Sequence, residues 1–259
     1  MIERMATARA LPRVHVEPVM GTVVSLDIRD RHADPTAVAA AMAWLHDVDR
    51  RFSTYRADSE IRRLDRGDLA LVDASPDVRW VLDRCAALRR ETDGFFDALA
   101  GGRLDPSALV KGWAAQRAAD ILSAGGATDF CLSAGGDVVT RGSALPGRWW
   151  RVGIQHPHDR SAIAARVRAR DLAIATSGAY ERGAHVVDPA TGEPPGGVLS
   201  VTVTGPDLGT ADAYSTAAFA MGGDGPDWTL RLDGYEAMTI LADGAVLRTP
   251  GFPLLEERA

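Results

Sequence analysis

The sequence predicts an α+β domain with a mixed, largely antiparallel sheet and flanking helices. Helical patterns dominate the first half of the chain, and short alternating patterns typical of strands dominate the second half. The regular alternation of strand and helix that indicates a parallel α/β sheet does not occur. No repeat or low-complexity linker divides the chain. We therefore expect one domain over residues 16–259, preceded by a flexible extension over residues 1–15.

The composition is that of a globular protein with an ample core and an acidic balance. The 259 residues are 46% hydrophobic and 25% charged, with a formal net charge of −6. Such a chain is not expected to bind nucleic acid, and any phosphate that it binds must be held by local groups or a metal. No apolar run reaches the roughly 18 to 20 residues of a membrane span, and the first residues lack the apolar core of a secretory signal. Both observations favour a cytoplasmic location.

The two cysteines are expected to be buried free thiols. Cys85 and Cys131 form neither a CxxC pair nor a cluster with histidine, so the sequence indicates no zinc site and no disulfide. Cys85 falls on the apolar face of a predicted helix and Cys131 in a strand-like run, where a thiol behaves as a small apolar group.

Capping signals open the helices of the first half. Asp34–Pro35 and Ser75–Pro76 each place a capping side chain before a proline at the first helical position. A short polar helix is expected to begin at Ser59. Asp105–Pro106 gives the same signal for a further helix, which Gly125 is expected to end.

Alternating apolar and polar residues predict the strands. The first is expected from Val19 to Ile28. Later strands and a hairpin around Asp243–Gly244 are expected at Phe130–Leu132, Trp150–Ile154, Ile163–Leu172, Leu199–Val203, Met238–Leu241 and Ala245–Leu247. Three arginines of one strand, Arg166, Arg168 and Arg170, would share a face, for which a solvated surface is favoured over an anion site.

The last predicted helix, from Asp212 to Met221, carries a spacing that a hard cation can use. Asp212 and Thr216 lie one turn apart, so their oxygens would project from one face with Cβ atoms roughly 5–6 Å apart. Mg²⁺ prefers oxygen ligands and typically binds one or two carboxylates together with substrate phosphates. The spacing alone favours a plainer arrangement, in which Asp212 caps the helix and Thr216 bonds back to the preceding turn.

Two other polar residues have structural alternatives. His185 could be a core histidine that bonds the Asp188–Pro189 turn, and the residues alone favour this. Lys111 could be a solvated amine on a helix surface. Nucleotide-binding and hydrolase motifs of the types GxGxxG, GxxxxGK[ST] and GxSxG are missing from the sequence, which argues against the enzyme classes that use them.

A series of phrases in chain order resembles the ApbE family, the FAD:protein FMN transferases. The phrases cover nearly the whole chain, and HVVDPATG and ADAYST are the most specific. They are MGT (Met20–Thr22), FSTYRADSEIRRLD (Phe52–Asp65), GFFDAL (Gly94–Leu99), LDPSALVKGWAA (Leu104–Ala115), LSAGGDVVTRG (Leu132–Gly142), ATSGAYER (Ala175–Arg182), HVVDPATGEP (His185–Pro194) and ADAYSTAAFAMG (Ala211–Gly222).

The resemblance implies an activity and a set of site residues. It implies that FAD is cleaved with the help of Mg²⁺, that FMN is attached by a phosphoester to a Thr or Ser of an acceptor flavoprotein, and that AMP is released. It places Mg²⁺ on Asp212 and Thr216, with oxygens at Ser215 and the main chain of Ala108. His185 and Asp212 are then the expected catalytic residues, with His185 as the base. The expected FAD-binding residues are Met20, Tyr55, Phe95, Phe96, Asp97, Asp105, Lys111 and Val187.

The chemistry of the residues agrees with this assignment. A pyrophosphate carries concentrated negative charge, which a dication must neutralise before a hydroxyl can reach phosphorus in an acidic protein. A threonine hydroxyl is a poor nucleophile at neutral pH, so a base is expected to assist, with an effect of about 10²–10⁴-fold. The near-neutral reference pKa of histidine suits this role.

Two alternative functions remain open at the level of the sequence. In an FAD pyrophosphatase, water would replace the acceptor hydroxyl and the products would be FMN and AMP. In a non-catalytic FAD-binding or storage protein, turnover would be lost. The second alternative draws on the short segment between Asp97 and Asp105, which is usually longer in the family and could reshape one wall of the flavin pocket.

Overall fold

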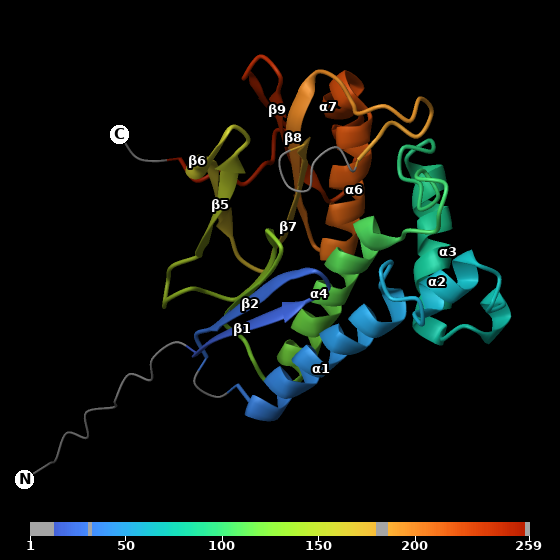
Figure 1. Ribbon diagram of the computed structural model, residues 1–259. Helices are drawn as coiled ribbons and strands as arrows, with labels where there is room; N and C mark the ends of the chain where they lie inside the picture. The colour runs from blue at the N-terminus through green and yellow to red at the C-terminus, as the bar shows by residue number, and fades with distance from the viewer. Residues whose placement is uncertain (1–12, 31–32, 180–185, 257–259) are drawn as a thin grey trace, which may run out of the picture.

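An eight-stranded sheet forms the centre of the molecule (Figure 1). The computed structural model describes residues 13–30, 33–179 and 186–256. The strand order is β1-β2-β3-β4-β7-β8-β9-β10, and neighbouring strands pair antiparallel. The strands are β1 (Arg13–Val19), β2 (Thr22–Ile28), β3 (Phe130–Ala134), β4 (Asp137–Arg141), β7 (Ala173–Gly178), β8 (Val198–Gly205), β9 (Glu236–Leu241) and β10 (Val246–Arg248).

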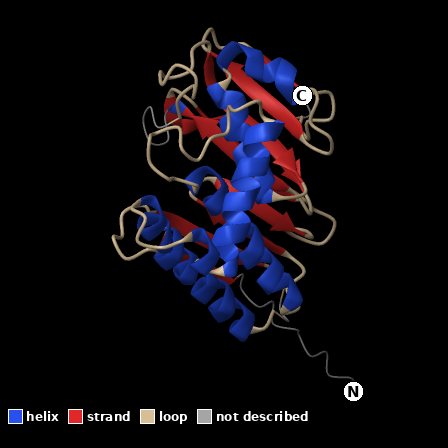
Figure 2. Cartoon of the chain, turned by 90° about the vertical axis from the view of Figure 1, so that its right-hand side faces the viewer, coloured by secondary structure: helices blue, strands red, loops and turns tan. Residues whose placement is uncertain are grey.

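Helices cover one face of this sheet, as Figure 2 shows. The helices are α1 (Pro35–Phe52), α2 (Glu60–Asp65), α3 (Pro76–Glu91), α4 (Ser107–Ala124), α6 (Leu208–Ala220) and α7 (Gly225–Thr229), with 3-10 turns at Leu71–Asp73 and Gly222–Asp224. A two-stranded sheet of β5 (Trp150–His156) and β6 (Asp159–Ala169) packs on the other face, over a smaller core that includes Trp150 and Val167. The expected α+β class with a largely antiparallel sheet and flanking helices is confirmed.

The N-terminal hairpin differs from the sequence expectation. β1 begins at Arg13, so the last three residues assigned to an extension belong to the sheet. The chain then turns at Met20 and Gly21, with φ values of 55° and 66°, before β2 begins at Thr22. Positive φ at both central residues is what a two-residue type I′ hairpin turn requires. The single strand expected from Val19 was therefore wrong at its start.

The helices expected in the first half are present, but only one of the three predicted cap-and-proline signals, Asp34–Pro35, forms as expected. Ser75 makes no capping hydrogen bond, and α4 begins at Ser107 with Pro106 as its cap residue. Oδ1 of Asp34 accepts a hydrogen bond from N of Thr36 at 2.8 Å, and Oγ of Ser59 accepts one from N of Arg62 at 3.1 Å. α3 begins at Pro76, and Gly125 follows the last residue of α4. α1 and α4 bury their apolar faces in a core that they share with the sheet. This packing fixes the first turn of α4 relative to the strands.

The arginine-bearing face of β6 is solvated, as expected. Arg166 and Arg168 of β6 are exposed, as is Arg170, which follows the end of the strand. The guanidinium of Arg168 lies 4.3 Å from the centre of the Trp149 ring. Within the described part of the chain, the helices are too short or too polar to span a bilayer.

The two thiols are expected to be unreactive in the folded protein. Burial raises the pKa of Cys85 and of Cys131 to about 12. At pH 8 only about one thiol in ten thousand would then be a reactive thiolate. Iodoacetamide followed by mass measurement should find neither cysteine modified in the native protein and both modified in denaturant. Rapid labelling of the native protein would show that the thiols are not buried as described.

Candidate active site

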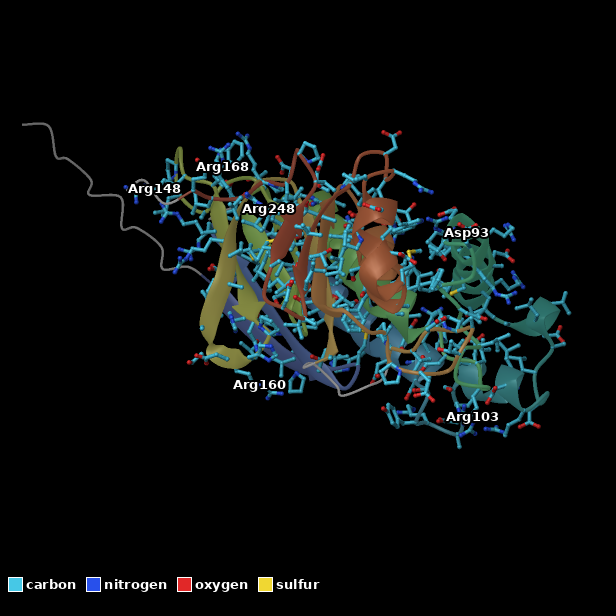
Figure 3. The ribbon with its side chains drawn as sticks, turned by 90° about the horizontal axis from the view of Figure 1, so that it is seen from above. Asp93, Arg103, Arg148, Arg160, Arg168 and Arg248 are labelled. Atoms are coloured by element: carbon cyan, nitrogen blue, oxygen red, sulfur yellow. The ribbon has the colours of Figure 1, made fainter. Side chains whose placement is uncertain are left out.

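A cavity of about 310 Å³ opens where several elements meet. Its walls come from the loop after α3, the first turns of α4, the end of β7, the segment Val186–Pro189, and α6. Figure 3 shows Asp93 and Arg103, which flank the loop after α3, on the side of the molecule opposite Arg160 and Arg168 of β6. The cavity therefore lies on the helical side and not under the β5–β6 sheet.

Small residues let α4 and α6 approach closely beneath this cavity. A Cβ atom at Gly112 would lie 2.5 Å from the carbonyl oxygen of Leu208 and 2.8 Å from Cβ of Asp212. A Cβ atom at Gly209 would lie 3.2 Å from the backbone of Trp113. The close approach allows N of Gly112 to donate a hydrogen bond to Oδ2 of Asp212 at 3.1 Å. The glycine thus places a carboxylate of one helix against the backbone of the other.

We expect Gly112→Ala to destabilise the protein. The added methyl would collide with the backbone of α6, and overpacking of this kind costs about 1–3 kcal/mol, although Ala is otherwise preferred in a helix. Urea unfolding measures the change in the free energy of unfolding. Gly223→Ala is the matched control, because a Cβ at Gly223 meets no atom within 4 Å. Equal stability of the two variants would contradict the close helix contact.

One ammonium group lies between two buried carboxylates at the floor of the cavity. Nζ of Lys111 lies against Oδ2 of Asp137 and 3.3 Å from Oδ2 of Asp212. The side chains of Asp137 and Asp212 are 2% and 5% exposed, and that of Lys111 is 20% exposed. Buried charge is stable only when it is compensated, so these groups depend on one another. Lys111 is also the single lysine of the sequence; the remaining cationic side chains are arginines and histidines.

The polar side chains of α6 do not follow the alternative in which Asp212 caps the helix and Thr216 bonds back to the preceding turn. α6 begins at Leu208 and its capping side chain is that of Asp207, so Asp212 lies inside the helix and is not its cap. The bond back to the carbonyl of Asp212 is made by Oγ of Ser215, at 2.9 Å. Oγ1 of Thr216 instead lies 3.2 Å from Oγ of Ser177 and lines the cavity with Asp212. The expected helix start at Asp212 was therefore wrong, and the capping role with it.

The structure brings most of the predicted site residues to this cavity. Its lining includes nine of them, namely Phe95, Phe96, Asp97, Asp105, Ala108, Lys111, Val187, Asp212 and Thr216. Ser215 is buried behind the lining, where its hydroxyl lies 2.8 Å from that of Ser177. Met20 is half-buried at the β1–β2 turn and Tyr55 is 95% exposed, and neither is among the lining residues. His185 lies outside the described residues.

Two acidic residues of the lining are held by local hydrogen bonds. Oδ1 of Asp105 accepts a hydrogen bond from N of Ser107 at 2.9 Å, which fixes it at the start of α4. Oδ1 of Asp97 accepts one from N of Leu99 at 2.9 Å, and its other oxygen lies 3.3 Å from Nε of Arg89. Both carboxylates are therefore oriented before any ligand binds.

Sequence reasoning missed Asp137 and Ser177 as site residues. Asp137 was noted only as part of LSAGGDVVTRG, and Ser177 only as part of ATSGAYER. Oδ1 of Asp137 accepts a hydrogen bond from N of Thr176 at 3.1 Å, which directs its other oxygen at Lys111. The available signal was an acidic residue directly after two glycines, Gly135 and Gly136, which both adopt positive φ.

The sequence pattern of the ApbE family matches residues 20–102 and 98–239. The chain belongs to the ApbE family. This membership agrees with the convergence of the family's phrases on one cavity, since the matched residues include Asp97, Lys111 and Thr216.

Two curated relatives of this ApbE-family chain are named FAD:protein FMN transferase. The protein from Klebsiella pneumoniae is 33% identical over 156 residues, which are 56% of this chain and 45% of that protein. The protein from Haemophilus influenzae is 24% identical over 247 residues, covering 70% of this chain and 71% of that protein. The chain thus spans less than half the length of the first of these relatives.

The fold of ApbE proteins is also recovered by comparison with solved structures. The flavin transferase ApbE from Vibrio cholerae superimposes with a TM-score of 0.83 and 23% identity, over 95% of this chain and 99% of that one. The apbe protein from Thermotoga maritima gives a TM-score of 0.83, 23% identity and coverage of 93% and 97%. These matches establish a shared fold.

Proposed function

We propose that this ApbE-family protein is a Mg²⁺-dependent FAD:protein FMN transferase. It cleaves the diphosphate of FAD, attaches FMN by a phosphoester to a Thr or Ser of an acceptor flavoprotein, and releases AMP. In this reaction the acceptor oxygen bonds to the phosphorus of the FMN half, the anhydride bond to AMP breaks, and the hydroxyl proton passes to a base. The site lies in an acidic protein that we expect to act in the cytoplasm.

One observation carries the proposal. The start of α4, the ammonium of Lys111 and the oxygens of Asp212 and Thr216 all face one cavity. The N-terminus of a helix and a lysine both favour a phosphate group. A carboxylate and a hydroxyl supply the oxygen ligands that Mg²⁺ prefers. A diphosphate bound to a dication matches both features, because the phosphates suit the helix start and Lys111 while the dication suits Asp212 and Thr216.

The residues present fit a magnesium ion. Asp212 is almost fully buried and faces the cavity, and Thr216 is on the same face of α6. In a regular α-helix the N–H of Gly112 bonds the carbonyl of Ala108, but here it also approaches Asp212. Ala108 lines the cavity, and because the N–H of Gly112 is shared with Asp212, the carbonyl of Ala108 could accept a further partner. When bound, the ion would neutralise charge on the transferring phosphoryl group.

Side chains of this protein would then orient FAD and accept the proton of the acceptor hydroxyl. Phe95 and Phe96 are in the loop after α3, and Asp105 is fixed at the start of α4. Lys111 would face the diphosphate, and Ser177 would hold the hydroxyl of Thr216 through their contact. The proposal assigns His185 as the base for the acceptor hydroxyl, and Met20, Tyr55 and Val187 as further contacts of FAD.

The test is an incubation with FAD, Mg²⁺ and a panel of purified flavoproteins that carry Thr or Ser near their flavin site. Mass measurement of each acceptor should detect added FMN, and chromatography should detect AMP in equal amount. Omission of Mg²⁺ or addition of a chelator should stop both. AMP and free FMN without labelled acceptor would support an FAD pyrophosphatase instead. Tight FAD binding without AMP under any divalent cation would identify a binding or storage protein.

A further inference from the structure

The floor of the cavity holds one ammonium group beside the carboxylate to which the proposed function assigns Mg²⁺. Nζ of Lys111 contacts Asp137 and lies 3.3 Å from Oδ2 of Asp212, the carboxylate assigned to Mg²⁺. An ammonium and a dication at the same carboxylate oxygen repel each other strongly in a partly buried site. If Lys111 relied on Asp212 for its compensation, each bound ion would have to displace it.

The two carboxylates are not equivalent partners for Lys111. Asp137 begins β4 directly after the turn at Gly135–Gly136, and N of Thr176 in β7 fixes its Oδ1 at 3.1 Å. Its remaining oxygen faces Lys111 at closer range than that of Asp212. The carboxylate of Asp137 is thus built into the sheet, whereas Asp212 is on α6 beside Thr216, in the position of a metal ligand.

We propose that Asp137 is a positioning residue that pairs with the ammonium of Lys111 and keeps it from becoming the main counter-ion of Asp212. The carboxylate of Asp212 could then bind a divalent cation while Lys111 faces the diphosphate. The inference rests on the proposed function for its substrate, but the arrangement of the two cations can be measured without FAD. Without Asp137, Lys111 would move to Asp212 and compete with the ion.

The first test measures the affinity for Mn²⁺ by electron paramagnetic resonance, without FAD. Asp137→Asn keeps an acceptor for N of Thr176 but removes the charge, and should weaken binding roughly 10-fold or more, as for other partners of metal ligands. Adding Lys111→Met to this variant should restore the affinity to within about threefold of the wild type, because the competing ammonium is gone. A double variant as weak as Asp137→Asn would overturn the proposal.

A matched control separates positioning from the general loss of a negative charge. Asp105→Asn removes a carboxylate that lines the same cavity, and its amide oxygen can still accept the hydrogen bond from N of Ser107. This substitution should weaken Mn²⁺ binding by no more than about threefold, because the Asp105 carboxylate does not hold a metal-binding side chain in place. Equal losses for Asp105→Asn and Asp137→Asn would overturn the proposal. Thermal unfolding of each variant checks that it is folded.

The second test follows Lys111 directly. Because the sequence contains one lysine, selective ¹³Cε-lysine labelling gives a single side-chain NMR signal. In the wild type this signal should move little on titration with Mg²⁺, since Asp137 keeps the ammonium in place. In Asp137→Asn the signal should shift strongly, because the ion displaces the ammonium from Asp212. The same response in both proteins would overturn the proposal, whether or not FMN is transferred.

If Asp137→Asn does not fold, Lys111→Met in the otherwise native chain tests the proposal by removing the ammonium instead of its partner. Removal of the ammonium should tighten Mn²⁺ binding several-fold in the absence of FAD, because a neighbouring positive charge disappears. Weaker binding would overturn the proposal, whereas unchanged binding would show that Asp137 already prevents Lys111 from competing with the ion. The result does not depend on catalysis, so failure of the proposed function would be recognised separately by the absence of AMP.

Discussion

Asp212→Asn is expected to lower FMN transfer by about a thousandfold or more, because several kcal/mol of charge stabilisation on the phosphoryl group would be lost. The carboxylate is 5% exposed and faces the cavity, and its Oδ2 accepts a hydrogen bond from N of Gly112 at 3.1 Å. An asparagine retains the shape and an acceptor for Gly112, so the fold should be preserved. The measurements are AMP release and FMN attachment with saturating FAD over a range of Mg²⁺ concentrations.

A control on the same helix makes this result specific. Asp207→Asn changes the capping residue of α6, where asparagine also accepts the hydrogen bond from N of Thr210. Asp207 is not among the residues that line the cavity, so its substitution should alter the rate by no more than about threefold. An Asp212→Asn variant that keeps full activity and its response to Mg²⁺ would refute the assignment of the metal site.

Elements with local signals could be predicted from the sequence. The caps of α1 and α2 are decided by contacts within three residues, such as that between Asp34 and Thr36. β1 was missed because its pattern is inverted. Val14 and Val16 are 64% and 58% exposed, whereas Glu17 turns toward α1 and bonds Nε2 of His46 at 2.7 Å. Pairing with β2 stabilises β1, although the residues of β1 do not show the alternation that predicts a buried face.

The candidate site was predictable where one element carries its geometry. Asp212 and Thr216 share a helix face, so their spacing in the sequence describes their spacing in space. Asp137 and Ser177 could not be assigned in this way, because their partners are on other elements. The contact of Asp137 with Lys111 joins β4 to α4, and that of Ser177 with Thr216 joins β7 to α6. Such contacts depend on the sheet order, which no local pattern specifies.

Lys111→Met is expected to lower kcat/KM for FAD by roughly 30- to 100-fold. Among the described residues that line the cavity, Lys111 carries the one cationic side chain, and it is 20% exposed. Loss of a partly buried charge that faces a diphosphate corresponds to about 2–3 kcal/mol, less than for a fully buried pair because solvent screens it. Steady-state kinetics with varied FAD should show the loss mainly in KM if Lys111 holds the ground state, and in kcat if it holds the transition state.

Lys111→Arg distinguishes charge from placement. The guanidinium keeps the positive charge but is planar and larger, so it cannot occupy the point between Asp137 and Asp212 in the same way. We expect this variant to retain FAD binding better than Lys111→Met but to remain well below the wild type in kcat. Because removal of the ammonium should also tighten Mn²⁺ binding without FAD, the two ligands respond in opposite directions to one substitution. A parallel loss of both affinities would instead indicate that Lys111 supports the fold of the cavity, and would contradict its role as a phosphate-facing cation.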